Sequence, residues 1–413
     1  MEPTRRDLFK LAGASAVGLA LGCGASSGEI ASAVVEPSGD RVTVAVWTQR
    51  SAARGAVAIT GPDGKTRTTM LELHDGVGAV ELDGLAPATV YQLAVSVDGA
   101  TLDHRVRTAP ADDDPAPARI AIIADIDPSP EFETDLFDQV VAQAPDLTIA
   151  IGDFPYTDNG PPAETLAEYR ARHAEVRLHP PVRRLLAASA VRAIYDDHEF
   201  RNDWDAMRAA AEPARLTAAL QCWDEFFPVA AEHKYRNWRW GAHLECFLLD
   251  CRRYRSANAA PDDASKTMLG AEQLAWILDA VARSTAPFKL IFTSIPLDFG
   301  VGIDHWAAYK TERAVLFDGL LDIPGILFVT ADQHWFAAHR HAYGIREIQI
   351  GPVARGILTP GPPVTGVLYR AQRYNAGIVD VAPDSLTITG LGEAGEAFYT
   401  ETFTPADLTP RRT

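Results

Sequence analysis

The segment VRAIYDDHEFRNDW, residues Val191 to Trp204, changes from apolar to charged within a few positions. Its first part, Val191 to Tyr195, has the length and composition of a buried strand. The residues from Asp196 to Glu199 then supply four ionisable side chains in a row. Such a cluster is typical of a solvated loop, and equally of one wall of a metal site. The rest of the chain has to distinguish these two interpretations.

Three other apolar runs also end on acidic side chains. They are the run 120–123, followed by Asp125 and Asp127, the run 147–151, followed by Asp153, and the run 326–330, followed by Asp332 and His334. In α/β folds ligands bind beyond the carboxyl ends of the strands, so we expect these ends to converge on one cavity. Several carboxylates stay ionised in one pocket only when cations neutralise them. Their hardness predicts oxygen-preferring metals, with His334 as a nitrogen ligand.

The apolar runs alternate with helical stretches. The segment from Ala271 to Val281 has apolar residues at 274, 277, 278 and 281, which is the period of an amphipathic helix. This alternation predicts an α/β catalytic domain over residues 118–405. The Pro/Asp-rich segment 109–117 before it is predicted to be a linker.

Residues 30–108 have a different pattern, with short β-type runs separated by turn signals. The run from Arg41 to Trp47 alternates apolar and polar side chains, and Pro62-Asp-Gly64 marks a turn. This pattern predicts an all-β sandwich. The segment from Asp83 to Tyr91 resembles the Leu-x-Pro-x-Thr-x-Tyr corner of fibronectin type III domains. Because nothing here has catalytic spacing, we expect a structural or positioning role.

Length and charge limit the choice of function. A chain of 413 residues favours two domains. The formal net charge of −17 argues against nucleic acid or an anionic membrane surface as the main partner. An anionic ligand would need local arginines or bound metal. Three cysteines, Cys222, Cys246 and Cys251, lie in no CxxC spacing, and Cys246 is expected to be a buried thiol.

Residues 1–23 resemble a twin-arginine export signal, with Arg5 and Arg6 before a short apolar run. The run is too short to span a bilayer, so a cleaved signal is expected. Leu21-Gly22-Cys23 resembles the end of a lipoprotein cleavage site, which would leave Cys23 lipidated and the protein attached to a membrane. Plain signal cleavage nearby is the alternative. Either route predicts a periplasmic or cell-surface location. Nothing in the sequence indicates an oligomeric state.

The motifs together resemble those of the alkaline phosphatase D (PhoD-like) family of metallophosphoesterases. The resemblance covers residues 119 to the end and implies a four-layer αββα sandwich. The matching segments are GDFPY (Gly152–Tyr156), YDDHEFRNDW (Tyr195–Trp204), LDCRRYR (Leu249–Arg255), TMLGAEQ (Thr267–Gln273), and the strand ends at Asp125, Asp127, Asp332 and His334.

The resemblance implies two or more metal ions, Ca²⁺ together with Fe³⁺ or another divalent metal. Asp153 would bridge two of them. The implied ligands are Asp125, Asp153, Tyr156 and His334 for the first ion, and Asp153, Asp197 and Asp332 for the second. The implied reaction is attack of a metal-bound hydroxide on a phosphomonoester or phosphodiester.

His198 would then protonate the leaving oxygen, and Arg252, supported by Arg255, would clamp the phosphoryl oxygens. The compact chain predicts an open site that accepts bulky or diester substrates. The alternative function is a non-catalytic lipoprotein binding module that keeps a decayed site.

The chain departs from the family at several positions. Asp125 stands where a Cys is common, which makes iron less certain and a site of hard metals more plausible. Asp127 replaces a His of the wider superfamily, so its role as a ligand is open. Cys251 replaces a Thr. Which of Asp196 and Asp197 contacts metal is also open.

Overall fold

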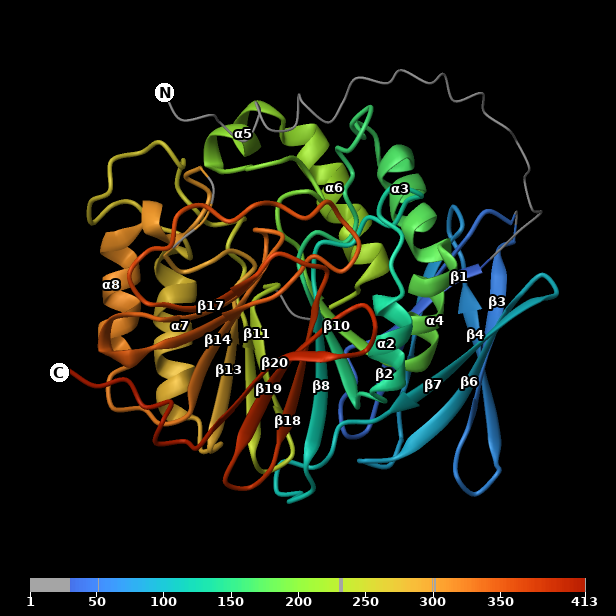
Figure 1. Cartoon of the computed structure of the whole chain (residues 1–413). Coiled ribbons are helices and arrows are strands. Elements are labelled where there is room, and N and C mark those ends of the chain that lie inside the picture. Colours follow the sequence, from blue (N-terminus) through green and yellow to red (C-terminus); the bar gives the residue numbers. More distant parts are fainter. Residues whose placement is uncertain (1–29, 51, 230–232, 299, 301, 413) are drawn as a thin grey trace.

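The computed structural model describes residues 30–50, 52–229, 233–298, 300 and 302–412. They form three β-sheets of nine, seven and four strands, with helices packed around the two larger sheets (Figure 1). The export signal predicted at residues 1–23, including Cys23, lies outside the described residues. Within the described part, no helix is long and apolar enough to cross a membrane.

The nine-stranded sheet has the order β20-β19-β18-β8-β9-β10-β1-β2-β5. Its three central strands, β8, β9 and β10, run parallel. The bounds are β1 Ile30–Val35, β2 Val42–Thr48, β5 Val77–Leu82, β8 Ala118–Ile123, β9 Leu147–Ile151, β10 Val191–Ile194, β18 Ala376–Val381, β19 Leu386–Leu391 and β20 Ala397–Phe403.

The seven-stranded sheet has the order β11-β12-β13-β14-β16-β15-β17. Its strands β12, β13, β14 and β16 run parallel. The bounds are β11 Arg236–Trp240, β12 Leu244–Leu248, β13 Phe288–Phe292, β14 Ile326–Thr330, β15 Phe336–Arg340, β16 Arg346–Gln349 and β17 Val367–Ala371.

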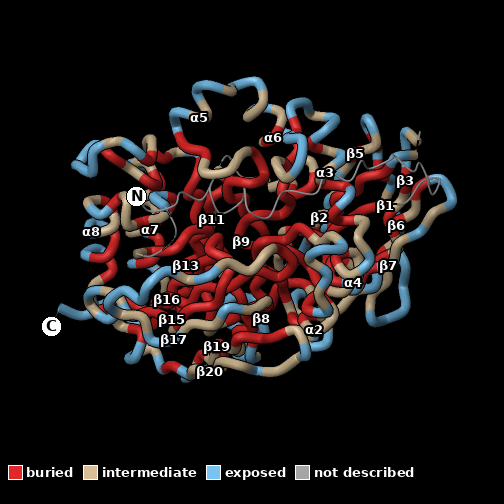
Figure 2. The backbone as a smooth tube through the Cα atoms, turned by 45° about the horizontal axis from the view of Figure 1, so that its top comes forward, coloured by how far each residue is buried: buried red, intermediate tan, exposed pale blue. Residues whose placement is uncertain are grey.

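The two large sheets pack face to face, and helices cover their outer faces. Ile120 and Ile122 of β8 share one core with Phe292 of β13, whereas the alternate residues Ala121 and Ile123 face the helices. Figure 2 shows buried residues throughout the middle of the molecule. The helices α2 Leu136–Ala142, α3 Leu166–Leu178, α4 Pro180–Ala188, α5 Ala206–Ala211 and α6 Pro213–Phe226 are associated with the first sheet, and α7 Gly270–Arg283 and α8 Lys310–Gly319 cover the second. The predicted α/β region is confirmed.

The N-terminal region is all-β, as predicted. Strands β1, β2 and β5 face a four-stranded sheet of order β4-β3-β6-β7, and Val44 packs in one core with Val57 and Val95. The four strands are β3 Arg54–Thr60, β4 Thr66–Glu72, β6 Val90–Val97 and β7 Ala100–Arg107. The region is not separate, because β1 pairs in parallel with β10 through Val35 and Val191. One sheet therefore runs through both the N-terminal and the catalytic region.

A buried ion cluster reinforces this junction. Glu36, directly after β1, accepts an ion pair from Arg192 of β10 at 2.7 Å and another from Arg236 of β11. Burial opposes ionisation of Glu36, but the two arginines outweigh it and lower the pKa of the carboxyl. The Arg192 guanidinium also lies 4.4 Å from the Trp238 ring. Three strands of two sheets thus meet at one carboxylate.

His104 of β7 links three elements on the other side of the junction. Its Nε2 lies 2.7 Å from Ser32 Oγ of β1, and its Nδ1 lies 3.1 Å from the Leu186 carbonyl of α4. Burial lowers the pKa of His104 to about 4. The neutral ring therefore donates through Nδ1 to the carbonyl and accepts the Ser32 hydroxyl at Nε2.

Candidate metal centre

The acidic strand ends predicted from the sequence lie together at one edge of the sandwich. Asp125, Asp153 and Asp197 follow β8, β9 and β10 of one sheet, and Asp332 follows β14 of the facing sheet. All four are at most 1% exposed. Parallel strands bring their carboxyl ends to the same edge, and the face-to-face packing of two sheets brings both edges close together.

A first group of potential ligands contains Asp125, Asp153 and His334, whose ligand atoms lie within 4.8 Å of one another. The Tyr156 hydroxyl lies 2.8 Å from His334 Nε2, so the phenol belongs to the same group. His334 Nδ1 lies 2.6 Å from the Gly356 carbonyl oxygen. A proton on Nδ1 leaves the lone pair of Nε2 facing the carboxylates, which is the usual arrangement of a histidine ligand.

Two further groups are linked to the first, one by sharing Asp153 with it and the other by sharing Asp197 with that one. One contains Asp153, Asp197 and His198, and the other contains Asp196, Asp197 and Asp332. Asp153 therefore belongs to both the first group and the second. The structure brings together all six residues predicted to bind metal.

Asp196 and Asp197 differ in their partners. Asp196 accepts hydrogen bonds from Arg252 Nε at 2.5 Å and Nη2 at 2.8 Å, and from Ser294 Oγ at 2.5 Å. Asp197 lies 3.7 Å from Arg252 and belongs to more of the ligand groups. The arginine already satisfies Asp196, so Asp197 is the better placed of the two to bind metal.

The electrostatics of the cluster call for cations. Burial, together with the neighbouring carboxylates Asp197 and Asp196, raises the pKa of Asp153 well above its usual range. Burial and the nearby Asp153 and Asp125 likewise raise the pKa of the Tyr156 phenol. A bound cation would reverse both effects. A donor set of carboxylates, one phenol and one imidazole fits hard metals such as Ca²⁺ and Fe³⁺.

The backbone around the ligands is held in unusual conformations. Asp125, Asp153, Asp332 and His334 have φ values of 56°, 57°, 75° and 60°, in the left-handed region that residues with a Cβ rarely adopt. Such strain clusters at functional sites, where surrounding contacts hold it in place. Gly152 has φ of 105°, and a Cβ there would lie 2.5 Å from Cβ of Asp196. The loops after β9 and β10 therefore pack directly on each other.

Glu199 ties the same two loops together. One carboxylate oxygen accepts from the Phe154 amide at 2.7 Å, and the other accepts from the Asp196 amide at 2.9 Å. Burial raises the pKa of Glu199 to about 8. Both oxygens are occupied by backbone donors, so Glu199 holds the two loops together.

His198 has a carboxylate partner that the sequence did not reveal. Its Nδ1 lies 2.6 Å from Asp158 Oδ1, while Asp158 Oδ2 accepts from the Asn202 amide at 2.7 Å. His198 Nε2 belongs to the ligand group of Asp153 and Asp197. Asp158 follows Tyr156 by two residues, and this closeness to a motif was the one available signal.

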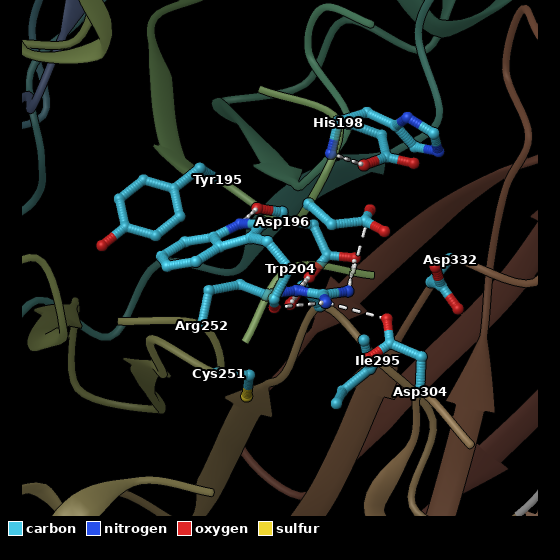
Figure 3. Close-up of polar contacts among 12 residues, drawn as sticks. Tyr195, Asp196, His198, Trp204, Cys251, Arg252, Ile295, Asp304 and Asp332 are labelled. Carbon is cyan, nitrogen blue, oxygen red and sulfur yellow. Dashed lines mark hydrogen bonds and ion pairs between the residues drawn. The ribbon is translucent and has the colours of Figure 1, made fainter. Parts of the chain in front are cut away.

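Arg252 lies between Asp196 and a second carboxylate, Asp304 (Figure 3). Arg255 meets the same carboxylate. Arg252 Nη1 lies 2.8 Å from Asp304 Oδ2, and Arg255 Nη2 lies 2.6 Å from Asp304 Oδ1. Both arginine side chains are completely buried. Asp304 was missed because it stands in no recognisable motif. The structure places both arginines next to the centre, each engaged by an acid.

Asp127 and Arg355 form an ion pair close to the first group of ligands. Asp127 Oδ2 accepts from Asn159 Nδ2 at 2.7 Å and lies 3.5 Å from Arg355 Nη1. Among the described residues, no group of potential ligands includes Asp127. Arg355, in the loop after β16, had no signal in the sequence.

Comparisons with known proteins agree with this geometry. The sequence model of the PhoD-like phosphatase family matches residues 130–361. Alkaline phosphatase D of Bacillus subtilis (strain 168) is 25% identical over 307 residues, which cover 62% of this chain and 52% of that protein. The match thus spans about half the length of that relative.

Two solved structures share the fold. The structure of PhoD superposes with a TM-score of 0.78 at 18% identity, covering 91% of this chain and 88% of that one. Purple acid phosphatase PPD1 from yellow lupin (Lupinus luteus) seeds gives a TM-score of 0.68 at 13% identity, covering 92% and 77%. With the family match over more than half of its length and the predicted motifs gathered at one site, this chain belongs to the PhoD-like phosphatase family.

Proposed function

We propose that this protein is an exported phosphoesterase that uses two or more metal ions to hydrolyse phosphomonoesters and phosphodiesters. The observation that carries the proposal is the overlap of the ligand groups, in which Asp153 and Asp197 each belong to more than one. Overlapping groups of hard donors suit adjacent cations, because a shared carboxylate can bridge them.

The residues would divide between two ions. Asp125, Asp153, Tyr156 and His334 would hold the first, and Asp153, Asp197 and Asp332 the second. Bound Ca²⁺ with Fe³⁺ or another divalent metal would supply an activated water and neutralise phosphoryl charge. Asp196 would instead receive Arg252 and fix the loop that carries Asp197.

His198 is the proposed proton donor to the leaving oxygen. Asp158 at 2.6 Å fixes the ring and stabilises its protonated form, so that Nε2 presents the proton to the centre. Asp158 is therefore a positioning residue that acts through His198.

Arg252 and Arg255 were predicted to clamp phosphoryl oxygens. Such contact would require Arg252 to leave Asp196 or Asp304, both bound at 2.8 Å or less. We therefore propose that the pair chiefly positions Asp196 and the loop around Trp204, whose carbonyl accepts from Arg255 at 2.5 Å.

A cavity near the centre offers room for the organic part of a substrate. It has a volume of about 410 Å³ and is lined by His305, Trp335, Pro362 and Val364, among others. Its lining residue Gly300 lies against Gln333, the neighbour of Asp332. This supports the predicted tolerance of bulky or diester substrates. Comparing turnover of 4-nitrophenyl and bis(4-nitrophenyl) phosphate tests it, and strict monoesterase behaviour would count against it.

We also propose that the N-terminal region is fibronectin type III-like and has a positioning role. The Ala86 amide donates to the Tyr91 hydroxyl at 2.9 Å, at the corner predicted from the sequence. Export through residues 1–23, with lipidation of Cys23 or plain cleavage, is proposed on the sequence motif alone.

The decisive experiment loads purified protein with Ca²⁺ and iron and measures phosphate release from 4-nitrophenyl phosphate. Asp153→Asn should abolish both phosphate release and metal binding, because Asp153 is the ligand shared by two of the groups. Asp380→Asn, at a surface ion pair with Arg119, is the control and should retain activity. Unchanged activity in Asp153→Asn would refute the assignment. Absence of bound metal under every loading condition would instead favour a non-catalytic lipoprotein with a decayed site.

A further inference from the structure

Arg355 is fixed to the strand end that carries Asp125. The loop before it hydrogen-bonds along that segment, from the Val353 amide to the Ala124 carbonyl at 3.0 Å and from the Ala354 amide to the Asp125 carbonyl at 3.2 Å. The Asp127 amide returns a bond to the Ala354 carbonyl at 2.9 Å. The backbone of Arg355 therefore keeps a set position beside the proposed first metal.

Aromatic rings hold the guanidinium itself. It lies 4.8 Å from the centre of the Tyr156 ring and 4.8 Å from that of Phe132. Stacking on rings orients the planar group while leaving its N–H groups, which lie in its plane, able to donate. Since the Tyr156 hydroxyl lies 2.8 Å from His334 Nε2, the cation rests against a side chain of the proposed centre.

Arg355 differs from Arg252 and Arg255 in how fully it is engaged. Those two side chains are 0% exposed and reach Asp304 at 2.8 Å and 2.6 Å, whereas Arg355 is 10% exposed and lies 3.5 Å from Asp127. The oxygen of Asp127 that faces it also accepts from Asn159. A guanidinium has five N–H donors, and among the described residues Arg355 has this one long ion pair to an acid, which leaves most of the donors for an anionic ligand.

We propose that Arg355 binds a non-bridging phosphoryl oxygen of the substrate and makes the site favour dianionic phosphomonoesters over monoanionic phosphodiesters. This inference rests on the proposed phosphoesterase function. The chain carries a net charge of −17, which repels a dianion more strongly than a monoanion. A fixed local cation offsets that difference where the phosphoryl group docks. Asp127 in this arrangement positions Arg355 and does not bind metal.

The experiment compares wild type with Arg355→Gln and Arg355→Lys. It measures kcat/KM for 4-nitrophenyl phosphate and bis(4-nitrophenyl) phosphate, and the Kd of orthophosphate by calorimetry with the metal-loaded protein. Arg355→Gln should weaken orthophosphate binding and monoester kcat/KM by about 10- to 100-fold, the usual value of a hydrogen bond to a charged group. The kcat/KM for the diester should fall much less. Arg355→Lys should give values between those of wild type and Arg355→Gln, because lysine keeps the charge but lacks the planar set of N–H donors.

Arg373→Gln is the matched control, because Arg373 also joins an acid, Glu396, and a ring, Phe398, at a different place. It should leave the ester preference and the orthophosphate Kd unchanged. Elemental analysis of Asp127→Asn should find the same metal content as in wild type. Loss of an ion in this variant would show that Asp127 is a metal ligand.

The outcomes separate the two proposals. If wild type hydrolyses neither ester, the proposed function fails, and the orthophosphate Kd still decides the role of Arg355. If wild type hydrolyses both esters but Arg355→Gln lowers both equally, or leaves the orthophosphate Kd unchanged, the inference about Arg355 is overturned.

Discussion

His198 is the side chain whose proposed role depends most on a single neighbour. Asp158 holds Nδ1 at 2.6 Å, and the Asn202 amide holds Asp158 in turn. The ring also lies against Tyr156, with centroids 4.1 Å apart. These contacts allow the ring little freedom to rotate, so its Nε2 has a defined direction.

The role of His198 predicts a dependence on the leaving group. In His198→Asn, hydrolysis of an alkyl phosphate should fall by about 10²- to 10⁴-fold, because an alkoxide needs a proton to leave. Hydrolysis of 4-nitrophenyl phosphate should fall far less, since nitrophenolate leaves unprotonated. Asp158→Asn should show the same pattern with a smaller loss, and steady-state kinetics on both esters measures it.

The control is His243→Gln, at a histidine that contacts the Pro115 carbonyl in the linker. It should affect neither ester. An equal loss on both esters in His198→Asn would contradict a proton-donor role and would point to metal binding or folding instead.

The sequence revealed site residues only where they stood in a motif. Asp125, Asp153, Asp197 and Asp332 end strands, and the topology of parallel strands requires such ends to meet. Asp304 and Arg355 stand in loops with no periodic pattern. Their place depends on how those loops fold back on the strand ends, as Ala354 does on Asp127. Contacts of this kind leave no local signal.

At the scale of elements, apolar runs located the buried strands well. The runs 147–151 and 326–330 coincide with β9 and β14, and the predicted helix Ala271–Val281 lies within α7. The pairing of β1 with β10 was not predictable, because it joins residues far apart and depends on twist and helix cover. Ala31 and Ala33 of β1 pack under the helices of the catalytic region, and short side chains of that kind are compatible with many environments.

The link between β1, β7 and α4 predicts a pH dependence of stability. In the unfolded chain His104 titrates near 6.5, whereas burial lowers its pKa to about 4 in the folded protein. The contribution of the neutral His104 to the stability of the fold is therefore fully present above pH 6.5 and is lost as pH falls toward 4. The shift corresponds to about 3 kcal/mol of unfolding free energy.

Urea unfolding at pH 7.5 and pH 4.5 measures this effect. His104→Gln, which can keep both hydrogen bonds but cannot titrate, should lose less stability over that interval than wild type. His74→Gln removes an exposed histidine and should behave as wild type does. Identical pH slopes for wild type and His104→Gln would contradict the assignment.

For the whole molecule, the shared sheet predicts that the catalytic region will not fold alone. A fragment that begins at Ala118 would leave the edge of β10 unpaired and would uncover helix-facing surface now packed on Ala31, Val35 and Trp47. It would also leave Arg192 and Arg236 without Glu36, and a buried charge without its partner costs about 3–5 kcal/mol.

Size-exclusion chromatography and binding of a hydrophobic dye would test the fragment. We expect aggregation or a dye-binding state without a cooperative unfolding transition. The full chain under the same conditions is the control. A monodisperse fragment that unfolds cooperatively and binds metal would show that the N-terminal region is dispensable.

The position of β1 also affects the order of events during synthesis. Glu36 meets partners 156 and 200 residues later in the chain, so its ion pairs are complete only after β11 has been made. Multidomain proteins commonly fold their N-terminal domain first, while the rest is still being translated. Here the beginning of the chain has to wait for the middle, and pairing over such distances is slow. During that interval the edge of β1 that later pairs with β10 is unpaired, and an unpaired strand edge can pair with another chain.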